Sequence, residues 1–313
     1  MTPAQKFAWL FGGVGLVLIS ATVIGLSLLR GARSDSSRAT IENLNARVRA
    51  WWVMTALVAV ALALGPIVTV VMFAVASFFA LREFVTLTPT RPADYIPLLL
   101  CFYVLVPLQY ALIAFGQYGT FAIGIPVYAF LLLPAFASLA ADTEDFLERA
   151  AKVQWALMIT VYCISYVPAL FLLDIPGYER SDALLLFYLL LVVQLSDVLQ
   201  YVFGKLFGKT KLAPQVSPSK TVEGLIGGGL SASAVGCALW WITPFNWWQS
   251  ALMSLTIVAM GFLGGLTLSA VKRSLGAKDW GAMIEGHGGV LDRLDSVSFA
   301  APVFFHLTRF FFT

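Results

Sequence analysis

Charged side chains gather in one short stretch near the C-terminus, between two apolar segments. This stretch, "SAVKRSLGAKDWGAMIEGHGGVLDRLDS", covers residues 269–296. Asp292 and Asp295 are three residues apart, so on a helix both carboxylates point to the same side. Two like charges at the edge of a membrane helix repel each other unless a cation lies between them. Because Mg²⁺ prefers oxygen ligands and shares them with substrate phosphates, the pair predicts a magnesium site.

The residues around these aspartates favour a phosphate-bearing ligand. Gly286, Gly288 and Gly289 allow the backbone to approach a ligand closely and to point N–H groups at an anion. We interpret His287 as a phosphate contact, since a phosphate monoester nucleophile is already anionic and needs no general base. The cations that would neutralise a polyphosphate are Lys272, Arg273, Lys278 and Arg293. The alternative is a loop whose charges only pair with each other, which leaves the paired aspartates beside the glycines unexplained.

A second charged loop, "QLSDVLQYVFGKLFGKTKLAPQVSPSKTVEG", covers residues 194–224. Asp197 lies about two helical turns before the end of an apolar run, and a carboxylate at membrane depth is a functional candidate by default. The alternative is a structural partner for a lysine or a hydroxyl. Ser217 or Thr221 is expected to cap the helix that follows, and Lys220 would lie at its positive end, where phosphate can bind. Glu223 is expected to complete the capping arrangement or to hold a lysine.

Composition identifies lipid as the solvent of most of the chain. The 313 residues are 59% hydrophobic and 12% charged, with a mean hydropathy of +0.85. A soluble domain carries about 25% charged residues, so this chain is predicted to be an all-α polytopic membrane protein. The net charge of +3 gives no reason to expect nucleic acid as a partner. Cys101, Cys163 and Cys237 lie in apolar runs, without the spacing of a metal site or a disulfide framework.

About ten membrane-spanning helices are expected, because a bilayer core needs about 20 apolar residues per helix. The second and third are separated at Gly65-Pro66, where a turn is easy. The predicted spans are 7–29, 51–64, 66–81, 96–115, 119–140, 153–173, 183–204, 223–243, 247–270 and 296–312.

The basic residues support this count and predict the orientation. With ten spans, 17 of the 20 lysines and arginines fall in five loops on one side of the membrane. Basic residues in short loops mark the cytoplasmic side, so both termini are expected on the opposite side. Merging the second and third spans would separate the basic 30–50 loop from the other four. The five loops are 30–50, 82–95, 141–152, 205–222 and 271–295.

Both charged loops resemble the signature of the phosphatidate cytidylyltransferase (CDP-diacylglycerol synthase) family. The C-terminal loop matches the signature at Ser269, Lys272, Arg273, Lys278, Asp279, His287, Gly288, Gly289, Asp292, Arg293 and Asp295. The upstream loop matches at Asp197, Tyr201, Gly204, Gly208, Ser217, Pro218, Lys220, Thr221, Glu223 and Gly224. The first 180 residues share mainly their hydrophobic helices with the family. We therefore separate an N-terminal transmembrane region, 1–180, which includes the basic loop 30–50, from a catalytic region, 181–313.

The resemblance implies that phosphatidate attacks the α-phosphate of CTP, so that CDP-diacylglycerol forms and pyrophosphate leaves. It also implies a multi-pass inner-membrane enzyme whose catalytic loops face the cytoplasm, where CTP is available; a homodimer is left open. Mg²⁺ is the implied cofactor, and K⁺ is a candidate second ion. The residues expected to hold the cation are Asp197, Asp292 and Asp295. Those expected to bind CTP and lipid phosphates are Lys220, Lys272, Arg273, Lys278 and Arg293, supported by Ser217, Thr221, Asp279, His287, Gly288 and Gly289.

One position departs from the family pattern. Family members commonly carry an acidic residue four positions before the signature serine, where this chain has Gly265. The departure leaves one metal ligand fewer, with Asp197 or Asp279 in compensation, or it marks a branch with another lipid acceptor. Two other functions stay open: a CTP-dependent lipid or polyprenol kinase, which would release CDP, and a transporter or non-catalytic relative. The chain has no Walker-type GxxxxGK[ST], no nucleophile elbow and no HExxH motif.

Overall fold

The computed structural model describes residues 2–31, 34–178, 182–284, 286 and 288–313, and this part of the chain is almost entirely helical. The predicted all-α membrane fold is therefore confirmed. The elements are α1 (Pro3–Gly31), α2 (Asp35–Leu64), α3 (Pro66–Leu87), η1 (Pro92–Asp94), α4 (Tyr95–Leu100), η2 (Cys101–Leu105), α5 (Val106–Ala114), α6 (Tyr118–Ile123), η3 (Gly124–Ala129), α7 (Phe130–Ser138), α8 (Phe146–Leu157), η4 (Met158–Cys163), α9 (Ile164–Ala169), η5 (Leu170–Leu172), α10 (Asp182–Phe207), β1 (Lys211–Ala213), β2 (Ser217–Thr221), α11 (Val222–Ala238), η6 (Trp240–Ile242), α12 (Trp247–Ser274) and α13 (Leu291–Phe312).

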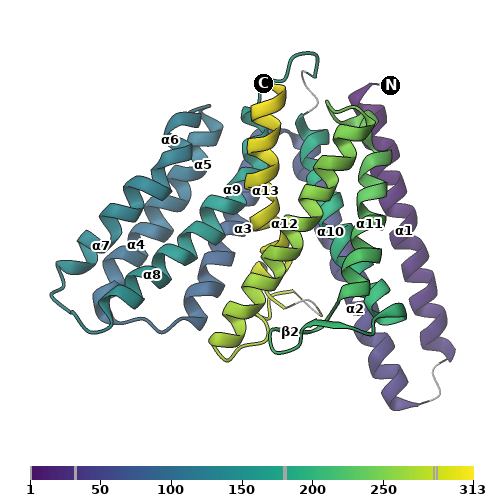
Figure 1. Ribbon diagram of the computed structural model, residues 1–313, viewed down its shortest axis with the longest axis horizontal. Coiled ribbons are helices and arrows are strands. Elements are labelled where there is room, and N and C mark those ends of the chain that lie inside the picture. Colours follow the sequence, from purple (N-terminus) through teal and green to yellow (C-terminus); the bar gives the residue numbers. More distant parts are fainter. Residues whose placement is uncertain (1, 32–33, 179–181, 285, 287) are drawn as a thin grey trace.

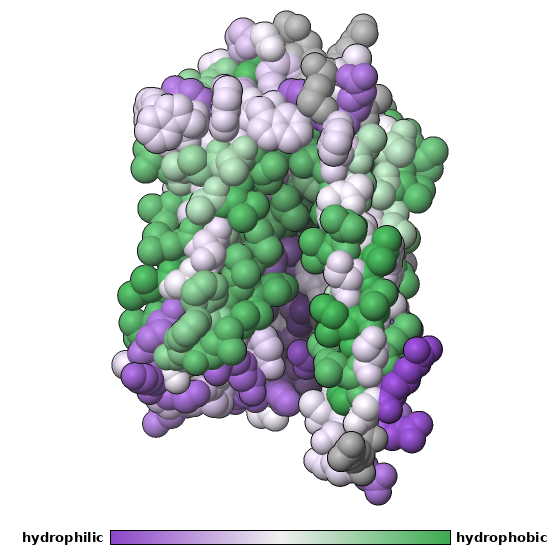
Figure 2. Space-filling model, turned by 90° about the vertical axis from the view of Figure 1, so that its right-hand side faces the viewer, coloured by the Kyte–Doolittle hydropathy of each residue, from purple (hydrophilic) through white to green (hydrophobic). Residues whose placement is uncertain are grey.

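Eight helical segments of the described chain are long and apolar enough to cross a membrane. The two other predicted spans, 223–243 and 296–312, correspond to the 17-residue apolar helix α11 and to α13, which carries three charged residues in its first five positions. Each predicted span therefore lies on helical structure, while the number of crossings remains a prediction. On the face drawn in Figure 2, apolar side chains fill the middle of the molecule, and hydrophilic residues lie toward both ends.

The helices alternate in direction, so that the charged loops collect at one end (Figure 1). The β1–β2 hairpin, the C-terminal end of α12 and the α7–α8 connection all lie at the lower end of that view, and both chain termini lie at the upper end. This arrangement places the five basic loops on one side, as the charge pattern predicted.

The helices α2 and α3 are separate, as predicted from Gly65-Pro66. Gly65 has a φ of +107°, which favours glycine, and Pro66 is the first residue of α3, where its missing N–H costs nothing. The basic segment 30–50, which was expected to be a loop between two spans, largely forms the first half of α2. Ser34 caps this helix by accepting a hydrogen bond from the Ser37 N–H at 3.2 Å. In Figure 1, the α1–α2 pair extends below the rest of the molecule.

The helices α10, α11, α12 and α13 pack closely because glycine and serine occupy their contacts. A Cβ atom added at Gly228 of α11 would lie 2.3 Å from the backbone nitrogen of Gln200 in α10. Ser250 and Ser254 of α12 donate hydrogen bonds to the Gly236 and Ser233 carbonyls of α11, at 2.9 and 3.0 Å. Small residues and interhelical hydrogen bonds are the means by which helices associate in lipid. This packing provides the rigid support for the site.

Three thiols in the described chain are free, as expected from their apolar surroundings. The division at residue 180 remains a prediction, and the structure shows contacts across it: α13 packs on α9 and on α3.

Candidate active site

The "SPSKT" segment forms a β-strand, not the start of a helix. β2 pairs antiparallel with β1, with Ser217 opposite Ala213 and Thr221 opposite Lys211. Of the two predicted caps of α11, Thr221 is the one observed: its Oγ1 accepts a hydrogen bond from the Gly224 N–H at 3.0 Å. Ser217 begins the strand instead.

Glu223 holds the start of the hairpin. Its carboxylate accepts hydrogen bonds from the backbone N–H groups of Lys209 and Thr210, at 3.0 and 3.1 Å. Glu223 thus holds a lysine, as one of its two expected roles proposed, but through the Lys209 backbone N–H, and so it fixes the loop after α10. This contact joins the start of α11 to the chain between α10 and β1.

Lys220 turns from the strand into the helical bundle. Its ammonium lies 4.6 Å from the centre of the Phe262 ring and 3.5 Å from the Phe262 carbonyl oxygen. Burial lowers the pKa of Lys220, and the charges of Asp197 and Asp295 act in the opposite direction. A Cβ atom added at Gly265 would lie 3.1 Å from the Lys220 nitrogen. The departure from the family pattern at this position therefore lies directly beside a predicted phosphate-binding cation.

Two of the predicted metal ligands, Asp197 of α10 and Asp295 of α13, belong to one half-buried charged cluster. The Asp197 carboxylate lies close enough to Asp295, Lys220 and Arg293 for the charges of all three to act on it. The Asp295 carboxylate accepts a hydrogen bond from the Ser296 N–H at 2.7 Å. The structure therefore places two of the three predicted metal ligands, which are 98 positions apart in the sequence, in the same cluster.

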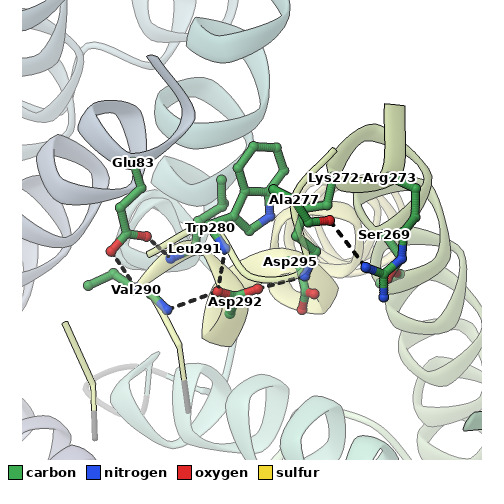
Figure 3. Close-up of polar contacts among 12 residues, drawn as sticks. Glu83, Ser269, Lys272, Arg273, Ala277, Trp280, Val290, Leu291, Asp292 and Asp295 are labelled. Carbon is green, nitrogen blue, oxygen red and sulfur yellow. Dashed lines mark hydrogen bonds and ion pairs between the residues drawn. The ribbon is translucent and has the colours of Figure 1, made fainter. Parts of the chain in front are cut away.

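Asp292 has different surroundings from Asp295, although both lie in the first two turns of α13 (Figure 3). One of its oxygens accepts a hydrogen bond from the Lys272 ammonium at 2.6 Å, in an ion pair that is almost completely buried. The other accepts the backbone N–H groups of Trp280 and Gly289, both at 2.8 Å. The cation next to this carboxylate is thus a lysine of α12, and the same Lys272 charge acts on Asp295.

The loop between α12 and α13 has one further carboxylate contact, which the sequence did not suggest. Glu83 of α3 accepts hydrogen bonds from the N–H groups of Val290 and Leu291, both at 2.9 Å (Figure 3). The only signal available was that Glu83 lies in the apolar run "FFALREFVTL", just beyond the predicted span 66–81 and next to Arg82.

The other predicted residues lie closer to the surface. Arg273 donates to the carbonyl oxygens of Val216 and Ala277, at 3.4 and 3.2 Å, and so links α12 to the hairpin. Lys278 and Asp279 are exposed. A Cβ atom added at Gly288, whose φ is +80°, would lie 3.3 Å from the Asp279 Cβ. His287 lies outside the described residues.

Arg293 is the predicted cation with an unused donor. Its Nε atom is buried and has no hydrogen-bond partner among the described residues, while its carbonyl accepts from the Gln194 side chain at 3.0 Å. Its charge acts on both Asp197 and Asp295.

The donor set suits a magnesium ion held by two carboxylates. Among the described residues, no three Asp, Glu, His or Cys side chains group as ligands of one ion. Mg²⁺ does not require three, because it commonly binds one or two carboxylates together with waters and substrate phosphates. Asp197 and Asp295 fit that requirement. Asp292 fits it less well, since both of its oxygens already accept protein donors.

Sequence comparisons find relatives of this chain among known proteins. The sequence model of the cytidylyltransferase family matches residues 45–311. The chain is 36% identical over 298 residues to the uncharacterized protein YnbB of Escherichia coli, covering 94% of this chain and 95% of that protein. It is 33% identical over 218 residues to the phosphatidate cytidylyltransferase of Bacillus subtilis, covering 69% and 78%. The match to the phosphatidate cytidylyltransferase of Staphylococcus aureus is 38% over 157 residues, covering 49% of this chain and 60% of that protein.

Proposed function

The chain belongs to the cytidylyltransferase family, and from this we propose that it transfers CMP from CTP to phosphatidate, forming CDP-diacylglycerol and pyrophosphate. The observation that carries the proposal is the half-buried cluster of Asp197, Asp295, Lys220 and Arg293. Lys220 belongs to β2, which lies at the end of the bundle where the basic loops collect (Figure 1). Two carboxylates and two cations in a membrane protein suit a reaction between two phosphate groups.

The reaction requires little proton transfer. A phosphate oxygen of phosphatidate forms a bond to the α-phosphorus of CTP, and the bond from that phosphorus to the bridging oxygen of the β-phosphate breaks. The electron pair leaves with pyrophosphate. The nucleophile is already an anion at neutral pH, so the protein must mainly align the groups and neutralise charge.

Each residue of the cluster has a proposed role in that task. Lys220 and Arg293 bind the phosphates of CTP, and the free Nε donor of Arg293 supports this assignment. Asp197 and Asp295 hold Mg²⁺, which when bound would neutralise charge on the phosphate oxygens. Lys272 and Asp292 keep the loop and the start of α13 in place. Arg273 and Lys278, at the surface, meet the lipid phosphate or the triphosphate as it enters.

The lipid is proposed to approach from the bilayer. Figure 2 shows a hollow with hydrophilic residues inside and apolar surfaces on both sides, on the side of the molecule where α1 and α11 lie. Such a shape suits a substrate with a charged headgroup and acyl chains. We propose that this end of the protein faces the cytoplasm, because most of its basic residues lie there.

The deciding experiment uses purified protein with CTP labelled in the cytosine ring, phosphatidate in mixed micelles and Mg²⁺. We expect label in CDP-diacylglycerol and one pyrophosphate released per lipid formed. Asp295→Asn, which removes a charge from the cluster, serves as the inactive control. Release of CDP with no labelled lipid would identify a CTP-dependent lipid kinase instead, and no turnover with phosphatidate would remove the proposed reaction.

A further inference from the structure

We propose that Glu83 is a positioning residue for this reaction: from α3 it fixes the first turn of α13 and thereby sets where Asp292 and Asp295 lie. The proposal rests on the proposed function for its catalytic consequence, but not for its geometry. It assigns part of the active site to the N-terminal half of the chain, which sequence patterns had treated as hydrophobic helices alone.

The contacts of Glu83 are specific to a carboxylate. One oxygen accepts the Val290 N–H and the other accepts the Leu291 N–H, both at 2.9 Å. These are the first free amides of α13, which have no carbonyl partner inside the helix. Negative charge is favoured at that end by the helix dipole. The residue is only 7% exposed, so both bonds form away from bulk water.

Two glycines provide the space in which the carboxylate lies. A Cβ atom at Gly289 would lie 2.3 Å from one Glu83 oxygen, and a Cβ atom at Gly281 would lie 2.9 Å from the other. Both glycines therefore permit backbone to surround the carboxylate closely. Glycine at 289 has a reason here beyond binding a ligand phosphate, which was its predicted role.

Phe84, the residue next to Glu83, also holds the loop before α13. Phe84 stacks on Trp280 with ring centres 4.9 Å apart and an angle of 18° between the planes. The backbone N–H of Trp280 donates to one oxygen of Asp292, and the same oxygen accepts the Gly289 N–H. Adjacent residues of α3 thus hold the loop on both sides of Asp292, one through hydrogen bonds and one through ring contact.

This arrangement gives Glu83 a role in positioning and not in chemistry. Each of its oxygens accepts a backbone amide, so the whole carboxylate is engaged in holding the start of α13. Loss of the contact would release the first turn of α13, and with it the carboxylates of Asp292 and Asp295. A displacement of about 1 Å in a catalytic group can cost about a hundredfold in rate.

The test compares Glu83→Gln with the matched surface variant Glu148→Gln in the full-length protein. Glutamine has nearly the same shape, but its NH₂ group cannot accept one of the two amide hydrogens. We expect kcat for CMP transfer to fall about ten- to a hundredfold, with KM for CTP within about threefold. Glu148 is 63% exposed and pairs only with Lys152 in the described structure, so its variant should match the wild type. Equal kcat for Glu83→Gln and wild type would overturn the proposal.

A second measurement does not depend on catalysis. Hydrogen–deuterium exchange of peptides spanning 288–297 should become faster in Glu83→Gln, because the Val290 and Leu291 amides lose an acceptor, and stay unchanged in Glu148→Gln. Gly281→Ala, which pushes a methyl group toward the same carboxylate, should produce the same change if Glu83→Gln does not fold. Unchanged exchange in both Glu83→Gln and Gly281→Ala would reject the proposal that Glu83 holds the start of α13. If exchange is faster in Glu83→Gln but the wild type transfers no CMP, the proposed reaction is rejected. The positioning role of Glu83 is then retained.

Discussion

Asp292 and Asp295 have the same residue type and nearly the same place in the sequence, yet their surroundings differ. Asp292 accepts one ammonium and two backbone N–H groups. Asp295 has the adjacent Ser296 N–H and lies in the cluster with Asp197. The donors on Asp292 occupy most of the about four acceptor sites of a carboxylate, whereas Asp295 keeps more of its lone pairs for a ligand.

This difference predicts opposite effects for two matched substitutions. Asp292→Asn removes the ion-pair partner of the buried Lys272 ammonium, so the free energy of unfolding should fall by about 3–5 kcal/mol. Asp295→Asn removes one of two like charges that lie close together, and should leave stability unchanged or slightly higher while Mg²⁺-dependent transfer is lost. Denaturant titration in micelles measures the first quantity, and the CTP assay measures the second. Equal losses of stability in both variants would contradict the separation of roles.

The residues of the site could be predicted from the sequence better than their partners could. Charged residues are few in so apolar a chain, so the sequence identified Asp197, Lys220 and Asp295 as one set of candidates. The ion pair between Lys272 and Asp292 was not assigned, because spacing along the chain does not say which cation faces which carboxylate. Glu83 was missed since its partners are backbone amides more than 200 residues away.

At the scale of helices, the site depends on how closely α10 and α11 approach. Gly224 and Gly228 of α11 lie against the α10 backbone, where a Cβ would be 2.7 Å from the Gln200 oxygen or 2.3 Å from its nitrogen. Asp197 and Lys220 belong to the segments that this contact joins. Any increase in the separation of the helices would move one side of the cluster away from the other.

Gly228→Ala should therefore destabilise the protein by about 1–3 kcal/mol, because the added methyl group has only backbone in front of it. Gly15→Ala in α1 is the control, since a Cβ there has no atom within 4 Å and alanine favours a helix more than glycine does. Thermal unfolding in the same detergent compares the two variants. A lower midpoint for Gly15→Ala than for Gly228→Ala would be incompatible with the observed helix contact.

The β-hairpin was the element that the sequence pattern did not predict. "SPSKTVEG" has the residues of a helix start, and its last part does form one, from Val222 onward. The strand before it depends on pairing with β1 and on Glu223 holding the chain at Lys209 and Thr210. These are contacts between segments, which local propensity does not contain.

For the whole molecule, the distribution of basic residues was the most informative pattern. It separated α2 from α3 and placed the five loops on one side, both of which the structure bears out. Hydropathy alone was a weaker guide to the spans, because α11 is short and α13 starts with charged residues. The side of the membrane on which the loops lie depends on insertion, and remains a prediction.

Labelling with a membrane-impermeant maleimide tests that orientation. In a background with the three native cysteines replaced by alanine, Gln117→Cys should react in intact cells, since Gln117 lies at the end of the molecule that carries the termini. Ser36→Cys, at the opposite end near the start of α2, should react only after the membrane is permeabilised. The reverse pattern would place the site outside the cytoplasm.

The contact between Glu83 and the last helix also has a consequence for how the protein is made. The carboxylate leaves the ribosome 207 residues before the first amide that it binds. At about 5–20 residues per second, the growing chain waits on the order of 10–40 s with this acidic group lacking its final partners. Assembly of the active centre is thus one of the last events of biosynthesis, and a chain released before its final helix should be a substrate for membrane proteases.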